Sequence, residues 1–306
     1  MLLGSIGPVW DGNEVWLLAA GGTLFYAFPL LYASSFSGFY LPLSIVLWLL
    51  VLRAIGIEFR MHVDNDVWRD FFDGVFSISS LLLLVLFGAA LGNVIRGVPL
   101  GDDHYFFVPL WTNFLPGPEP GALDWYTVLC AVMAVAVVTL HGALYVTLKT
   151  TGSLNNRMRV FIRRLWPLVA LGTPASFVAT MIVRPQVLDN YHANPVGWLI
   201  PVSVVAGLAG IVHFTHAGRE RDAFLSSCLY LIAMLSGAAF ALYPVLLPAS
   251  GDPSRSLTIY NSAAGPSSLS IGLIWWSIGM AIAVGYFVLV YTMFRGKVST
   301  QAGGHG

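Results

Sequence analysis

The feature that most constrains this chain is a series of apolar runs, each about as long as a bilayer is thick. A helix of roughly 20 apolar residues crosses the hydrocarbon core of a membrane. The runs lie at about 15–35, 38–57, 75–95, 125–148, 165–183, 197–217, 224–247 and 271–294. Backbone polar groups in hydrocarbon must be satisfied within the segment, and the dispersed alternating pattern of a membrane barrel is absent. The sequence therefore predicts an all-α, polytopic integral membrane helical bundle with eight spans.

Composition agrees with this class. Hydrophobic residues make up 57% of the chain and charged residues only 10%, with a mean hydropathy of +0.76. These values exclude a soluble domain. Cys130 and Cys228 both fall within predicted spans without a CxxC spacing, so we expect two packed thiols rather than a disulfide or a thiolate metal site. The final GGHG (303–306) is expected to be disordered.

The distribution of basic residues predicts the orientation. If the loop after the second span is cytoplasmic, twelve of the fifteen basic residues lie inside, and Arg96, Arg184 and Arg255 lie outside. The inner set is Arg53, Arg60, Arg69, Lys149, Arg157, Arg159, Arg163, Arg164, Arg219, Arg221, Arg295 and Lys297. Basic residues concentrate on the cytoplasmic side of membrane proteins. With eight spans, both termini are then cytoplasmic.

Asp11 and Glu14 are the first candidates for chemistry, because they stand where an apolar run begins. Carboxylates at the edge of hydrocarbon are costly unless they are solvated, capped or used. Their spacing of three is also that of a capping box, in which both side chains satisfy amides of the first helical turn. At the inner side of the membrane, such a carboxylate could also collect protons, and the two roles are compatible.

Arg53 is the one formally charged residue well inside a predicted span, and Glu58 follows near the same helix end. Arg53 could extend to the inner headgroups with Glu58 already in water. Alternatively, Glu58 and Asp11 meet at the inner helix ends as a polar vestibule. The residues alone leave both interpretations open.

Histidines and tryptophans complete the candidates. His141 lies inside the fourth predicted span, and His213 and His216 lie at the inner end of the sixth. A haem requires axial ligands placed together within a bundle, and no second well-placed histidine complements His141. We therefore expect neutral, hydrogen-bonded histidines and assign no metal. Trp16 is interpreted as an interfacial or packing residue, or as the lining of an apolar passage for a small gas.

The chain resembles subunit II of the cytochrome bd-type quinol oxidases over about 290 residues. The strongest block is GPVWDGNEVWLLAAGG (7–22), followed by SGFYLPL (37–43) and RAIGIEFR (53–60). HGALYVTLKTTG (141–152) and the closing pattern over 243–297 also match. Several ordered blocks are far more specific than any one of them.

The resemblance implies a bacterial cytoplasmic-membrane enzyme that oxidises quinol and reduces dioxygen to water. Haem b and haem d, together with the quinol site, would belong to a partner, subunit I. This chain would bind no cofactor, would stabilise that partner and would contribute access routes. Carried over by position, Asp11 and Glu58 match acidic residues of a cytoplasmic proton-entry region with Arg53 beside them, and Trp16 matches a tryptophan near an oxygen route. Membrane lipid and a small accessory subunit are further expected partners, and nucleic acid is not.

Members of that family usually have nine spans, arranged as two four-helix bundles plus one helix. This sequence starts just before the family's second helix, which leaves a misplaced start, a fragment and a true truncation open. If the first helix is truly absent, the first bundle has only three helices. We treat 1–306 as one membrane domain. Within it, 1–95 is the remainder of the first bundle, 125–250 the second four-helix bundle and 271–294 the last span.

Two other functions compete with the oxidase subunit. A membrane transporter of another class is the first, because prolines near Pro29, Pro201 and Pro244 could create discontinuous helices for a substrate. The predicted spans from residue 75 onward, however, carry no internal charge for ion coupling. The second is a scaffold that only stabilises a haem subunit.

Overall fold

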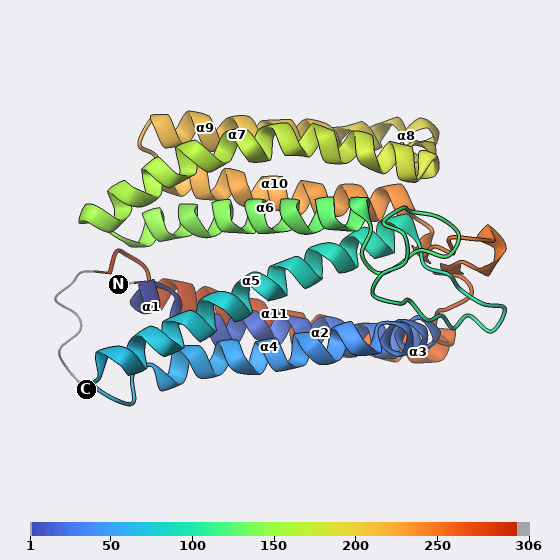
Figure 1. Ribbon diagram of the computed structural model, residues 1–306, viewed down its shortest axis with the longest axis horizontal. Coiled ribbons are helices and arrows are strands. Elements are labelled where there is room, and N and C mark those ends of the chain that lie inside the picture. The colour runs from blue at the N-terminus through green and yellow to red at the C-terminus, as the bar shows by residue number, and fades with distance from the viewer. Residues whose placement is uncertain (1, 299–306) are drawn as a thin grey trace.

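A computed structural model of the protein describes residues 2–298, and the predicted disordered tail at 303–306 lies outside them. The described part is mainly helical (Figure 1). The α-helices are α1 (Leu2–Ile6), α2 (Trp10–Ala27), α3 (Pro29–Gly38), α4 (Tyr40–Phe59), α5 (Asp66–Arg96), α6 (Trp125–Lys149), α7 (Gly152–Val183), α8 (Asp189–Ala193), α9 (Leu199–His216), α10 (Glu220–Leu242) and α11 (Pro266–Met293). Short 3₁₀ helices lie at Pro185–Leu188, Pro195–Trp198 and Pro253–Arg255, and β1 (Val245–Leu247) pairs antiparallel with β2 (Leu257–Thr258).

The long helices run roughly parallel to the longest axis of the molecule (Figure 1). One end of the molecule carries α1, the start of α2 and the end of α4, and we call it the α1 end. The opposite end carries the long connections 97–124 and 243–265, and we call it the loop end. Because successive long helices alternate in direction, each end gathers side chains from segments far apart in the sequence.

Helices α6, α7, α9 and α10 form what we call the second bundle. In it α6 packs on α7 and α10, and α9 packs on α10 and α7. Apolar side chains of all four helices fill a common core. Its buried members are Ala136, Leu140, Ala143, Leu144, Ile162, Val169, Ile211, Ala223 and Tyr230.

Helices α2 to α5 form what we call the first helix group, and α11 packs along α2. Neither α2 nor α11 has a buried residue within the described part of the chain. The first group joins the second bundle through α5, which packs on α6 at two glycines. A Cβ at Gly88 would lie 2.6 Å from the Cα atom of Ala131, and one at Gly92 would lie 3.0 Å from that of Thr127. Glycine at these positions lets the two backbones approach closely, as small residues do between membrane helices.

The fold class is confirmed, but the first predicted span differs in detail. Within residues 2–298, seven helices are long and apolar enough to cross a membrane. The remaining predicted span, the first in the chain at 15–35, is divided between α2 and α3. Proline disfavours the helical conformation of the residue before it, and Phe28, which precedes Pro29, has φ −135° and ψ 66°. Figure 1 shows α3 nearly end-on, turned away from the direction of α2.

The other two prolines of the transporter hypothesis do not divide a helix. Pro201 lies in the first turn of α9, where its missing N–H costs nothing, and Pro244 lies two residues beyond the end of α10.

Candidate functional site

The first feature of the α1 end is an ion pair between two helices of the first group. Arg53 of α4 pairs with Glu14 of α2, and their side chains are 22% and 23% exposed. The guanidinium carbon also lies 5.7 Å from the centre of the Phe76 ring on α5. A cation over an aromatic face is attracted by the ring quadrupole. Arg53 therefore contacts both neighbouring helices, α2 and α5, at one level of the first group.

Asp11 and Glu58 lie nearer the ends of the same two helices, and both are exposed. Asp11 is in the first turn of α2, whose N-cap is Val9, and no side chain caps the helix. The capping alternative for Asp11 and Glu14 is therefore wrong. In the part of the chain that the structure describes, neither Asp11 nor Glu58 is in an ion pair. The structure thus pairs Arg53 with Glu14 and not with Asp11 or Glu58.

Two other arginines at this end are paired with carboxylates. Arg60, just beyond α4, donates to both carboxylate oxygens of Asp73 on α5, at 2.6 and 3.0 Å. The hydrogen bond to Asp73 raises the pKa of Arg60. Arg69 donates to Asp64 at 2.5 Å. These pairs leave Asp11 and Glu58 as exposed acids flanking the deeper Glu14–Arg53 pair.

Trp16 lies five residues after Asp11 on α2 and contacts α11. Its ring stacks on Phe287, with centroids 5.5 Å apart and planes 16° apart, and 39% of the residue is exposed. A Cβ at Gly12 would lie 3.6 Å from the Tyr286 ring, so α2 and α11 approach closely here. The packing interpretation of Trp16 is thus consistent with the structure, and its surroundings are aromatic and apolar.

The histidines lie apart from these residues. His141 of α6 is hydrogen-bonded through Nδ1 to the Ser227 hydroxyl at 2.8 Å and stacks on Phe224. His213 and His216 are exposed at the end of α9. Among the described residues, no group of three or more His, Cys, Asp or Glu is placed to hold a metal ion.

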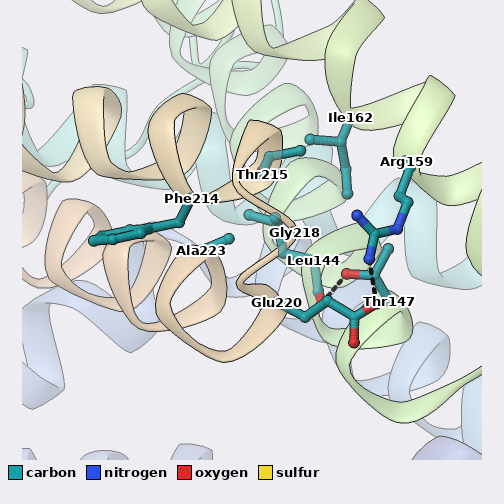
Figure 2. Close-up of a pocket in the computed structure, with 9 residues that line it drawn as sticks. All are labelled: Leu144, Thr147, Arg159, Ile162, Phe214, Thr215, Gly218, Glu220 and Ala223. Carbon is teal, nitrogen blue, oxygen red and sulfur yellow. Dashed lines mark hydrogen bonds and ion pairs between the residues drawn. The ribbon is translucent and has the colours of Figure 1, made fainter.

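The second bundle has its own polar cluster at the α1 end, around Glu220. Arg159 of α7 donates to Glu220 at 2.7 Å, and Asn155 donates to the same oxygen at 2.9 Å. Lys297, beyond α11, contacts the other carboxylate oxygen. Beside this cluster is a cavity of about 10 Å³, room for roughly one water (Figure 2). Every member of the Glu220 cluster has a partner, which makes it a clamp between helices rather than a site for a ligand.

The sequence did not predict one charged cluster, because it placed Arg96 in an outer loop. Arg96 ends α5 and pairs with Asp124, and the two side chains are 2% and 1% exposed. Arg96 also donates to the Asn93 side chain at 2.7 Å and to the Gly121 carbonyl at 3.1 Å. Asp124 accepts from the backbone N–H groups of Tyr126 and Thr127, both at 2.8 Å. The pattern Asp124-x-x-Thr127 before an apolar run is a capping-box signal that could have located it.

We compared the chain with protein families, with known proteins and with solved structures. The model of the family described as "Cytochrome bd terminal oxidase subunit II" matches residues 1–294. A "Probable cytochrome oxidase subunit 2" of Haemophilus influenzae is 31% identical over 328 residues, which cover 98% of this chain and 85% of the relative. "Cytochrome bd-I ubiquinol oxidase subunit 2" of Escherichia coli K12 is 30% identical, over 95% of this chain and 81% of the relative. The structure of a bd oxidase from Geobacillus thermodenitrificans aligns with a TM-score of 0.72 over 94% of this chain and 83% of that chain, and its 17% identity limits the likeness to the fold.

Proposed function

The chain belongs to the cytochrome bd terminal oxidase subunit II family, and we propose that its α1 end admits protons to the oxidase. As subunit II, it is part of a multi-span bacterial respiratory quinol oxidase, a haem-containing complex that includes a subunit I. The oxidase oxidises quinol and reduces dioxygen to water. Membership of this family replaces the transporter alternative.

Proton entry is the chemical role that the α1 end supports best. Reduction of one dioxygen to two waters consumes four protons, and a buried reaction site must draw them through titratable groups. We propose that Asp11 and Glu58 collect these protons and that Arg53 sets the field beside them. The observation that carries this proposal is that both acids are exposed at one end of α2 and α4, the helices that the Glu14–Arg53 pair holds together.

The orientation follows from the charge pattern. We propose that the α1 end faces the cytoplasm of a bacterial inner membrane and that the C-terminus is cytoplasmic. The basic residues Arg60, Arg69, Arg159 and Lys297 lie at helix ends on this side, which agrees with the positive-inside rule. Protons consumed for water would then be taken from the cytoplasm, and the reaction would generate a membrane potential.

The cofactors are assigned to the partner. We propose that subunit I binds haem b, haem d and quinol, and that this chain binds none of them. In support, His141, the histidine deepest in a span, already has Ser227 and Phe224 as partners. A small accessory subunit and membrane lipid remain proposed partners. The proposed assembly units remain 1–95, 125–250 and 271–294, a division that the helix packing supports.

Trp16 is proposed to border an oxygen route between α2 and α11. Its half-exposed ring and its stack on Phe287 provide an apolar surface that dioxygen, a small apolar molecule, can follow.

The decisive experiment replaces Asp11 by Asn in the native two-subunit oxidase. We expect the variant to assemble with full haem content, since the replaced side chain is exposed, and to reduce oxygen more slowly. The matched control is Asp66→Asn, which removes another exposed carboxylate at the same end. Wild-type turnover in fully haem-loaded Asp11→Asn enzyme would show that this carboxylate delivers no protons.

A further inference from the structure

The further inference concerns Glu14. The family resemblance implied that Arg53 lies beside Asp11 and Glu58, but the structure pairs the Arg53 guanidinium with Glu14. We infer that Glu14 is a positioning residue: it holds Arg53 and so prevents that guanidinium from pairing with the two acids of the proton entry. This inference rests on the proposed proton entry at the α1 end and adds to it a residue that acts through another.

The first step is where the charges stand along the helices. With a rise of about 1.5 Å per residue, Glu14 lies roughly 4–5 Å further along α2 than Asp11. Arg53 lies five residues before Glu58 on α4, or roughly 7–8 Å deeper from the same end. The ion pair is therefore about one turn deeper than the two exposed acids. Residues three apart share a helix face, so Asp11 and Glu14 lie on the same side of α2.

The second step is the set of groups available to Arg53. On α2 these are Glu14 and Asp11, and on its own helix the next acid is Glu58, five residues further on and off the face that positions three and four apart share. The neighbouring α5 offers the Phe76 ring, while its Asp73 is held by Arg60. From α11, the Tyr286 ring approaches α2 at Gly12. If Glu14 lost its charge, Asp11 and Glu58 would be the carboxylates left for a half-buried cation that is costly to leave alone in a membrane protein.

The third step is the effect of such a capture on proton uptake. A guanidinium beside a carboxyl group favours the ionised form and lowers its pKa. At a pH above that pKa, the protonated fraction falls roughly tenfold for each unit by which the pKa is lowered. A captured Asp11 or Glu58 would therefore pass protons more slowly, most of all at alkaline pH.

The test uses the native oxidase with Glu14→Gln, Arg53→Gln and the double variant. Turnover is measured as oxygen consumption with quinol across pH, and haem content measured by absorbance reports assembly. For Glu14→Gln we expect full haem, turnover reduced roughly threefold to tenfold at alkaline pH, and an alkaline limb moved to lower pH. The double variant, which lacks the freed cation, should be faster than Glu14→Gln at alkaline pH, with its alkaline limb moved back to higher pH than in Glu14→Gln.

Two further variants keep the outcome decisive. Asp222→Asn frees Arg219 at the α1 end of the second bundle, away from Asp11 and Glu58, and should leave the pH profile unchanged. If Glu14→Gln fails to retain haem, the exchange of Glu14→Arg with Arg53→Glu restores a pair of opposite sign. An assembled exchange variant with wild-type turnover and alkaline limb supports the inference, and one that is slow overturns it.

The inference and the proposed function fail in different ways. A double variant no faster than Glu14→Gln, or an assembled Glu14→Gln enzyme with a wild-type pH profile, refutes the role of Glu14 while leaving proton entry intact. Wild-type turnover in both Asp11→Asn and Glu58→Gln, each fully loaded with haem, refutes proton entry itself, whatever the Glu14 variants do.

Discussion

The second bundle and the first helix group of this subunit differ in how many apolar side chains they bury. The second bundle is closed around a continuous apolar core, and its buried hydroxyl of Tyr230 is satisfied by Thr173 at 2.8 Å. In the first group, α2 has no buried residue among those described, and α4 has three. The buried apolar cluster that the first group contributes to lies at its loop end, where Leu31 and Phe106 pack against the strand residues Leu247 and Leu257.

This difference indicates a division of labour. The second bundle buries its apolar side chains in one common core, and the polar cluster at its α1 end is paired around Glu220. The first group keeps a half-buried ion pair and exposed acids at its α1 end, an arrangement that stabilises little and leaves titratable groups accessible. If the proposed proton entry holds, stability and access belong to different helices of one subunit, and α5, which packs on α6, joins them.

The largest expected effect on assembly is at the contact between α5 and α6, which joins the two regions. Arg96→Leu leaves Asp124 as a buried charge without its partner at the α5–α6 junction. Removing one partner of a buried ion pair costs about 3–5 kcal/mol. We expect little or no assembled oxidase, measured as haem-loaded complex recovered from membranes. Arg69→Gln, which breaks an exposed pair at the other end of α5, should change the yield little. Equal yields of the two variants would show that the buried pair does not hold the two regions together.

A second prediction separates close packing from helix propensity within α5. Gly88→Ala places a methyl group 2.6 Å from the Cα atom of Ala131 and 2.7 Å from the Cβ atom of Ala134. Overpacking of this kind costs about 1–3 kcal/mol, which should lower the midpoint of thermal inactivation of the complex. Gly74→Ala is the matched control, because its Cβ meets nothing within 4 Å. Alanine favours a helix over glycine by about 1 kcal/mol, so the control should be neutral or stabilising. A Gly88→Ala enzyme as stable as the control would contradict the close α5–α6 contact.

A third prediction compares one hydroxyl in each region. Tyr230→Phe removes the buried hydrogen bond to Thr173 in the second bundle and should destabilise it by about 1 kcal/mol. Tyr26→Phe removes the bond from α2 to the Ser268 carbonyl at the start of α11, where the tyrosine is 41% exposed. Water can replace that partner, so we expect a loss below about 0.5 kcal/mol. The measurement is the midpoint of thermal inactivation, and a larger shift for Tyr26→Phe would reverse the comparison of the two regions.

The sequence predicted the membrane-spanning elements well, because apolar length is a local property. It also placed Asp11 and Glu58 at helix ends, which follows from their positions at the edges of apolar runs. The partner of Arg53 could not be predicted, since it depends on which helices are neighbours and how each is rotated about its axis. The same limit concealed the Arg96–Asp124 pair, whose residues lie 28 apart and meet only when α5 packs on α6. The division of the first span was more accessible, since Pro29 is a local signal of a helix break.

A small expected change in stability, at Trp16, sharpens the functional side of the comparison. Trp16→Leu removes the stack on Phe287 but keeps an apolar side chain between α2 and α11. An aromatic pair adds about 0.5–1.5 kcal/mol beyond its buried area, and the exposure of this ring places the loss at the lower end. We therefore expect normal assembly and normal turnover at saturating oxygen. If Trp16 borders an oxygen route, the KM for oxygen should change, whereas the KM for quinol should not. Phe161→Leu provides the matched control, since Phe161 is 40% exposed on α7 of the second bundle. A changed KM for oxygen in both variants would indicate a general effect of surface aromatics, and no change in either would leave Trp16 as a packing residue of an open helix face.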